Sequence, residues 1–371
     1  MNTNIIYFDN AATTYPKPDV VYKECMEIYK MIGVNPGRGI HRLSNSAFEI
    51  VAETRDLLST IFKSHSDKIH FTPSVTFSLN QIIKGLEIKN YSTILISPFE
   101  HNAVYRSVNH IASIHKSDIE YLSFDKFTMN DISSSPDVLV ITHQSNVTGF
   151  ILPINEICKK IKSLNPDCIT IIDGAQCGGY YSIDWRYIDF YCFSGHKSLY
   201  APSGIAGFIN NSNIEITPLL LGGTGVNSES EVMPNEGHER YEAGSLNLLS
   251  IIGLNLSIKW LLEIGVSSIM EKCSELTNLL LENKTDKLII HRDAQQKFSN
   301  TVSFNIHGIP PQDVEIKLST KGFALRSGLH CSPLTHKHIG TFQNGGSVRF
   351  SPGYFNSEDE VLRLLDTLGQ I

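Results

Sequence analysis

The chain has 371 residues, with 31 Lys and Arg against 38 Asp and Glu, and a formal net charge of −7. Its 41% hydrophobic and 19% charged residues are ordinary for a globular protein and exclude a disordered or collagen-like chain. Without a basic surplus there is no footprint for nucleic acid or acidic lipid, so we expect a small-molecule or protein partner.

Two further features of the sequence lead us to expect a cytoplasmic protein. No uncharged apolar run approaches the roughly 18 to 20 residues of a membrane span, and residues 1–7 lack the pattern of a signal peptide. The seven cysteines are scattered and include no CxxC pair, which argues against a disulfide framework and against a zinc site. His336 and His338 do not have a metal-ligand spacing either, and we expect both on the surface and no metal site.

The first two thirds of the chain alternate short β-branched runs with amphipathic stretches. Buried strands are expected at 68–72, 93–97, 137–142, 168–172, 188–193 and 204–209. Such alternation predicts a mostly parallel sheet with helices on both faces. The clearest helix is expected to begin near Ser46, because Glu49 completes a capping box before an apolar stripe.

The last third predicts a second, smaller α+β unit. A long helical stretch at 246–264 leads into expected strands at 301–306 and 347–350 and a closing helix at 358–368. We therefore expect a large domain over 16–255, a small C-terminal domain over 256–371, and an N-terminal segment, 1–15, that joins the small domain.

Polar side chains follow two neighbouring expected strands. Asp173 and Gln176 follow one strand, and Ser194, His196 and Lys197 follow the next. In an open α/β sheet such residues line the ligand crevice. A carboxylate beside a lysine suits a pyridoxal phosphate (PLP) site, since PLP needs an amine for a covalent link and an anion that keeps the pyridine nitrogen protonated.

Here the sequence resembles the class V, fold-type I PLP-dependent transferases, and specifically the Suf-type cysteine desulfurase and selenocysteine lyase group. The matching blocks are DNAAT at 9–13, RGIH at 38–41, FEH at 99–101, SNVTG at 145–149, DGAQ at 173–176, SGHK at 194–197, RYEAGSLN at 240–247 and RSGLHC at 326–331. Eight ordered blocks cover the chain almost end to end, so a chance match is negligible.

The resemblance implies roles around the PLP ring. Lys197 would form the covalent link, and Asp173 would pair with the pyridine nitrogen. Gln176 would bind the ring hydroxyl, and His101 would stack on the ring. Asn146 would approach the ring oxygen or the substrate.

The phosphate of PLP needs hydroxyl donors and amides at a helix start. The Val75 amide and the Thr76 side chain are candidates, joined by Ser194 and His196. The sequence departs from the family here, because Ser74 and Val75 replace part of a pattern of one Gly and two Thr, so one hydroxyl contact is lost. Ser245 replaces a family threonine that reaches the phosphate of the neighbouring subunit, which implies a homodimer.

The reaction is indicated by Cys331. It matches the family's persulfide-forming nucleophile, and nearby cationic groups would favour its thiolate. Arg349 matches the arginine that binds the substrate α-carboxylate, for which a bidentate donor is suited, and Arg326 is a second, weaker candidate. The other six cysteines are assigned to packing.

The sequence thus predicts a PLP-dependent cysteine desulfurase that converts L-cysteine to L-alanine and leaves a persulfide on Cys331. The sulfur would pass to an acceptor protein, toward iron–sulfur clusters or thio-cofactors. Alternatives are another class V reaction (an aminotransferase, a selenocysteine lyase or a lyase of another sulfur amino acid) and a non-catalytic PLP-fold binding protein.

Overall fold

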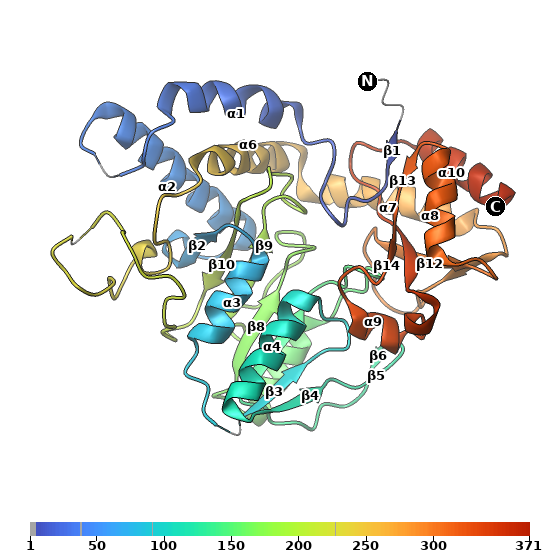
Figure 1. Ribbon diagram of the computed structural model, residues 1–371, viewed down its shortest axis with the longest axis horizontal. Helices are drawn as coiled ribbons and strands as arrows, with labels where there is room; N and C mark the ends of the chain where they lie inside the picture. Colours follow the sequence, from blue (N-terminus) through green and yellow to red (C-terminus); the bar gives the residue numbers. More distant parts are fainter. Residues whose placement is uncertain (1–4, 38, 91, 227) are drawn as a thin grey trace.

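The computed structural model describes residues 5–37, 39–90, 92–226 and 228–371. Arg38 of the RGIH block lies outside this set. The large domain is built on a seven-stranded sheet of order β2-β10-β9-β8-β7-β3-β4 (Figure 1). Its strands are β2 (Ile69–Thr72), β3 (Thr93–Ile96), β4 (Asp118–Tyr121), β7 (Val138–Thr142), β8 (Ile169–Asp173), β9 (Phe190–Ser194) and β10 (Ala206–Asn210).

The predicted mostly parallel sheet is confirmed, and β10 is its one antiparallel member within the described chain. β10 runs antiparallel to both β2 and β9, while the β9-β8-β7-β3-β4 pairs are all parallel. Because β10 separates them, β2 runs in the same direction as the other strands. The carboxyl ends of β2, β3, β7, β8 and β9 therefore meet at one edge of the sheet.

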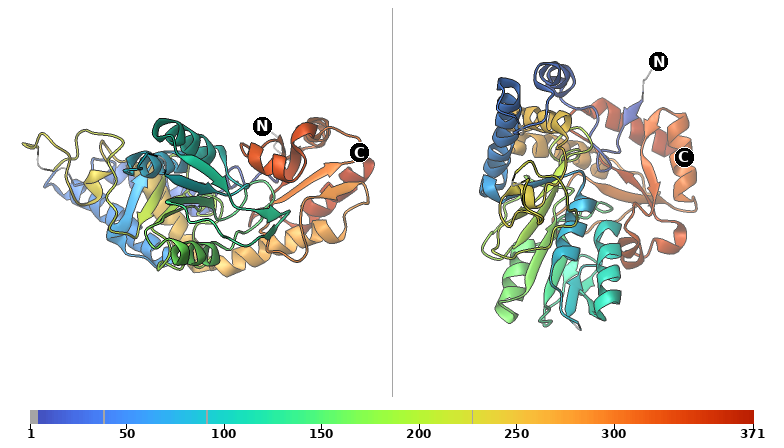
Figure 2. Two further views of the ribbon diagram at one scale, coloured as in Figure 1. Left: turned by 90° about the horizontal axis from the view of Figure 1, so that it is seen from below. Right: turned by 60° about the vertical axis from the view of Figure 1, so that its left-hand side comes forward.

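Helices cover both faces of this sheet (Figure 2). Alternate residues of β7 show the division, since Leu139 and Ile141 pack into one core and Val138 and Val140 into the other. The first core holds α1 (Asp19–Ile32), α2 (Arg42–Phe62), α5 (Ile154–Leu164) and α6 (Leu248–Ile264), and the second holds α3 (Val75–Gly85) and α4 (Asn102–His115).

The start of α2 differs from the expected one. The helix begins at Arg42, and the His41 imidazole caps it by accepting a hydrogen bond from Ser44 N at 3.2 Å. The capping box at Ser46 and Glu49 is therefore wrong, because both residues lie inside the helix. The expected apolar stripe is present, with Ala47, Val51 and Leu58 buried.

The small domain has a four-stranded antiparallel sheet of order β11-β12-β15-β14. Its elements are α7 (Val266–Glu282), β11 (Leu288–Ile290), β12 (Val302–Ile306), α8 (Pro311–Thr320), β13 (Phe323–Ala324), β14 (Arg326–Gly328), α9 (Pro333–His338), β15 (Ser347–Phe350) and α10 (Glu358–Gln370). β1 (Ile6–Tyr7) pairs with β13, so this strand lies against the small domain (Figure 1). A short hairpin, β5 (Phe124–Asp125) and β6 (Thr128–Met129), completes the fold.

The expected domain boundary after residue 255 falls inside α6. α6 packs against α1 and α2, whereas α7 packs against α10. We therefore propose Gly265, between α6 and α7, as the division. Within the described ranges, no single helix is long and apolar enough to cross a membrane, although α6 and α7, bent by 79°, meet that test of length and composition when taken together.

Candidate active site

A cavity of about 110 Å³ lies at the carboxyl edge of the large sheet. Nine of the residues assigned to the cofactor from the sequence line it: Val75, Thr76, His101, Asn146, Asp173, Gln176, Ser194, His196 and Lys197. Five neighbouring segments supply them because the five parallel strands end together. The sequence reasoning missed the other lining residues, which are Ser74, Ala103, Thr142, Gln144 and Ala175.

Asp173 and Lys197 are the charged pair of this cavity. Asp173 is the last residue of β8, and its Oδ1 accepts a hydrogen bond from Ala175 N at 3.0 Å. Burial raises the pKa of the Asp173 carboxyl, against the opposing effects of this amide and of Lys197. Burial lowers the pKa of the Lys197 ammonium to about 8. The neutral amine that a nucleophile or base requires is therefore much easier to reach near neutral pH than in an ordinary lysine.

His101 is the N-cap of α4, with its Nδ1 accepting a hydrogen bond from Ala103 N at 3.0 Å. This contact leaves Nε2 to carry the proton of the neutral ring. Burial, followed by the charge of Lys197, lowers the pKa of His101 to about 4. The side chain is therefore a neutral, fixed aromatic ring at neutral pH.

The start of α3 forms one end of the cavity. Ser74 caps the helix, since its Oγ accepts a hydrogen bond from Phe77 N at 3.2 Å. The amides of Val75 and Thr76 belong to the first turn and so have no acceptor within the helix. The Ser74 hydroxyl that departs from the family pattern thus organises the helix start, whose amides and positive dipole end favour an anion.

The loop before Lys197 is held by the N-terminal segment. The His196 carbonyl accepts hydrogen bonds from Thr14 N (3.1 Å), Thr13 Oγ1 (3.0 Å) and Lys17 Nζ (2.8 Å). Burial lowers the pKa of Lys17 to about 7. The end of the DNAAT block and the residues just after it therefore position the main chain beside Lys197, a role that the sequence reasoning did not assign to them.

Cys331 lies on a short loop of the small domain, between β14 and α9, and borders a groove next to the cavity. It is the exposed member of the seven cysteines, and the other six are buried. Burial raises the pKa of those thiols, for example Cys168 to about 12, and so disfavours their thiolates. The loop is restrained, because the Cys331 carbonyl accepts a hydrogen bond from Asn102 N at 2.7 Å and Ser332 N donates to Leu329 O at 2.8 Å.

Asn146 joins this loop to the cavity. Its Nδ2 donates to His330 O at 2.7 Å, and its Oδ1 accepts from Ser332 Oγ at 2.7 Å. Both polar atoms of the side chain thus bind the two neighbours of Cys331. These hydrogen bonds give Asn146 a loop-positioning role. Asn146 also lines the cavity, and its contact to the ring oxygen or the substrate stays a prediction.

Arg349 is buried behind Asn146. Its guanidinium donates to Asn146 O at 2.9 Å and pairs with Asp9 at 2.5 Å. Its Nε is a buried donor that has no acceptor among the described residues. Arg326 is exposed and lies opposite Arg349 in the β14–β15 register. Neither arginine lines the cavity itself.

A family model described as aminotransferase class V matches residues 6–364. The chain belongs to this family. It is 30% identical to a probable cysteine desulfurase of Pyrococcus abyssi, covering all of this chain and 95% of that protein. It is 31% identical to a cysteine desulfurase of Wigglesworthia glossinidia brevipalpis, over 99% and 92% of the two chains. The solved apo structure of a cysteine desulfurase from Thermococcus onnurineus NA1 has a TM-score of 0.89 at 28% identity, over 99% and 94%.

These comparisons confirm the predicted family, fold class and PLP dependence. The residues present also fit PLP. The His196 Nδ1 is a buried polar atom for which the described residues provide no partner, the start of α3 favours an anion, and Asp173 provides a buried carboxylate. Lys197, Asp173, Gln176 and His101 would hold the ring, and Val75, Thr76, Ser194 and His196 the phosphate.

Ser245 is exposed and does not line the cavity of its own chain.

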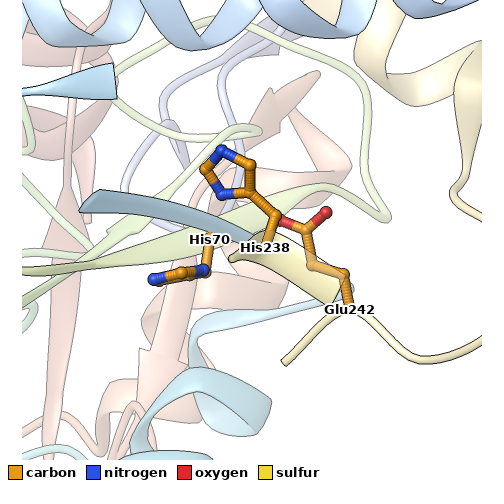
Figure 3. A group of neighbouring side chains, drawn as sticks. All are labelled: His70, His238 and Glu242. Carbon is orange, nitrogen blue, oxygen red and sulfur yellow. The ribbon is translucent and has the colours of Figure 1, made fainter. Parts of the chain in front are cut away.

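A separate group of side chains is formed by His70, His238 and Glu242. Their potential metal-ligand atoms lie within 4.8 Å of one another (Figure 3). Glu242 is bound there by the Arg55 guanidinium and by Phe71 N at 2.6 Å, so its carboxylate serves a buried ion pair.

The expected surface position of His336 is wrong. His336 is buried, and its Nδ1 lies 2.7 Å from Thr341 Oγ1, because α9 turns this side chain toward the loop that follows the helix. His338 is partly exposed and contacts Lys126 O at 2.5 Å.

Proposed function

We propose that this class V protein is a PLP-dependent cysteine desulfurase that converts L-cysteine to L-alanine and takes up the sulfur as a persulfide on Cys331. The position of Cys331 carries the proposal. The exposed thiol of Cys331 borders the groove that adjoins the cavity of Lys197 and Asp173.

PLP supplies an electron sink that stabilises negative charge at the substrate Cα. The Lys197 amine, whose pKa is lowered to about 8, takes up the Cα proton. Asp173 provides the buried negative charge that pairs with the pyridine nitrogen. Arg349, with Arg326 as the weaker candidate, binds the substrate carboxylate. The Cys331 thiolate forms a new S–S bond to the substrate sulfur as the carbon–sulfur bond breaks. The electron pair of that bond goes to the substrate Cβ, which takes up a proton on the way to alanine.

The active unit is proposed to be a homodimer in which Ser245 contacts the phosphate held by the neighbouring subunit. In support, Ser245 is exposed in its own chain, and Leu220, Leu221 and Val232 of the preceding loop are also exposed. Such apolar side chains favour burial against another chain. The Suf-type subgroup stays a prediction from the resemblance of the motifs DGAQ and SGHK. Selenocysteine stays an alternative substrate, and no sequence feature identifies the sulfur-acceptor protein.

Mass spectrometry of the holoenzyme after incubation with L-cysteine tests this function, with alanine measured in parallel. We expect a mass increase of one sulfur atom on the peptide that contains Cys331 and about one alanine per active site in the first turnover. Alanine without sulfur on Cys331 would instead indicate a lyase, and an amino-group transfer to a keto acid would indicate an aminotransferase.

A further inference from the structure

A groove of about 350 Å³ leads away from the cavity along α3 and α4. Thr76, His101 and Ala103 line both the groove and the cavity, and Cys331 borders the groove. Farther along, the groove is lined by Lys84, Arg106 and His110. The sulfur of a Cys331 persulfide would therefore face this groove.

The groove is cationic in a chain that is acidic overall. Acidic residues account for 38 of the 371 positions, yet none lies in α3, in α4 or in the segment 326–338 that carries Cys331. Lys84 and Arg106 are exposed, and neither has an acidic side chain within ion-pair distance in the part of the chain that the structure describes. These charges are thus free to attract an anionic partner.

The positions of the charges also indicate the size of the partner. α3 and α4 lie side by side (Figure 1). Thr76 and Asn102, at the starts of the two helices, line the groove together with Cys331. Lys84 lies eight residues after Thr76, which is about 12 Å along a helix that rises 1.5 Å per residue. A small thiol at Cys331 would not reach Lys84, whereas a segment of a protein would.

We propose that the α3–α4 groove binds the sulfur acceptor, and that this acceptor is a protein whose accepting cysteine is flanked by carboxylates. The inference rests on the proposed function. The acceptor thiolate attacks the outer sulfur of the Cys331 persulfide, a new S–S bond forms on the acceptor, and the S–S bond to Cys331 breaks with its electron pair remaining on Cys331 Sγ. The acceptor leaves as a persulfide and Cys331 returns as a thiolate, with no net oxidation.

Synthetic peptides test the charge of the acceptor. The holoenzyme is first converted to its persulfide with L-cysteine, and sulfur transfer is then followed to three peptides of equal length whose single cysteine is flanked by glutamate, glutamine or lysine. Rates are compared at equal thiolate concentration, because neighbouring carboxylates raise the pKa of a thiol. We expect the glutamate peptide to react roughly tenfold faster than the glutamine peptide at low salt, and this advantage to disappear near 1 M salt, where the Debye length is about 3 Å.

Charge-reversal variants test whether the acceptor binds in the α3–α4 groove. Lys84→Glu combined with Arg106→Glu should reverse the order of the peptides, whereas Lys159→Glu combined with Lys160→Glu, an equal charge change on exposed α5 positions, should leave it intact. Lys84→Glu alone should slow the glutamate peptide but not 2-mercaptoethanesulfonate, a small anionic thiol. If the rate of sulfur transfer fell equally for the peptide and the small thiol, Lys84 would act only through its long-range charge. That result would contradict the proposal that the groove binds the acceptor.

Equal rates for the three peptides with the unmodified holoenzyme would overturn the inference without the use of any variant. That result would also follow if the groove were already filled by a second copy of the chain. The initial alanine burst separates this failure from a failure of the proposed function. A burst followed by charge-independent sulfur transfer contradicts the acceptor inference alone, whereas no burst contradicts the desulfurase itself.

Discussion

The cavity and the Cys331 loop are built in different ways. The cavity lies where five parallel strands of one sheet end, so its residues are placed by continuous main-chain hydrogen bonds. The Cys331 loop belongs to the small domain, and contacts with Asn102 and Asn146 of the large domain hold it in place. The cavity is therefore the rigid part of the site, and the nucleophile depends on a few individual hydrogen bonds.

This difference suits the two halves of the proposed reaction. Proton transfer at the substrate needs fixed geometry and shifted pKa values, which burial at the sheet edge provides for Lys197 and Asp173. Sulfur transfer needs a thiol that both the substrate and an acceptor can reach, and Cys331 is exposed. The two regions should consequently fail separately when they are mutated.

Lys197→Ala should have the largest effect, because it removes the amine that links PLP and moves the proton. We expect loss of the visible absorbance of covalently held cofactor and a fall in alanine formation by at least ~10²-fold. Absorbance spectroscopy and an alanine assay measure both. The matched control is Lys160→Met, which removes an exposed lysine of α5 that does not line the cavity and should keep the absorbance. A Lys197→Ala variant that retained both signals would show that the cavity is misassigned.

Cys331→Ala should impair only the function of the Cys331 loop. The cavity is unchanged, so the cofactor absorbance and its response to L-cysteine should persist while alanine formation falls by about 10²-fold. Cys25→Ala, at a buried cysteine of α1, is the control and should keep alanine formation. Undiminished alanine production by Cys331→Ala would assign the protein to the ordinary lyases.

Asn146→Ala tests the contacts between the two regions. It removes two hydrogen bonds to the neighbours of Cys331, each worth about 1 kcal/mol, so we expect roughly a tenfold slower persulfide formation. Ser332→Ala removes one of the two and should cause the smaller loss. Quenched mass spectrometry of the Cys331 peptide gives the rates. If Asn146 served PLP instead, Asn146→Ala would weaken cofactor binding. Ser332→Ala would then have no effect on the rate of persulfide formation.

The two regions also differ in how far the sequence predicts them. Asp173, Gln176, Ser194, His196 and Lys197 follow from the polar ends of two apolar runs, whereas His101 and Asn146 follow from the family resemblance. All but Ser245 of the expected cofactor residues line one cavity. The loop contacts do not follow, because they join distant residues: Asn146 and His330 are separated by 184 positions, and Thr13 and His196 by 183. The start of α2 was missed for a local reason, since histidine is not one of the residues usually preferred as an N-cap.

The smallest expected effect concerns the electrostatics of the rigid region. Glu100 is buried beside His101, and its Oε1 accepts hydrogen bonds from Ser97 Oγ at 2.5 Å and Thr142 N at 2.9 Å. Burial raises its pKa to about 8 from an ordinary value of 4.5. Between these values the folded protein keeps a proton that the unfolded chain has lost. The contribution of Glu100 to stability is therefore complete below pH 4.5 and is lost as the pH rises through 8.

Glu100→Gln should remove this pH dependence, because glutamine keeps the Oε1 acceptor and cannot ionise. As the pH rises from 5 to 8, we expect the unfolding free energy of the wild type to fall relative to that of the variant. The fall should be at most about 1.4 kcal/mol per pH unit. Urea unfolding at a fixed protein concentration measures it, and Glu87→Gln, at an exposed position, is the control. Parallel pH profiles for wild type and Glu100→Gln would mean that Glu100 ionises in the folded protein as readily as in the unfolded chain.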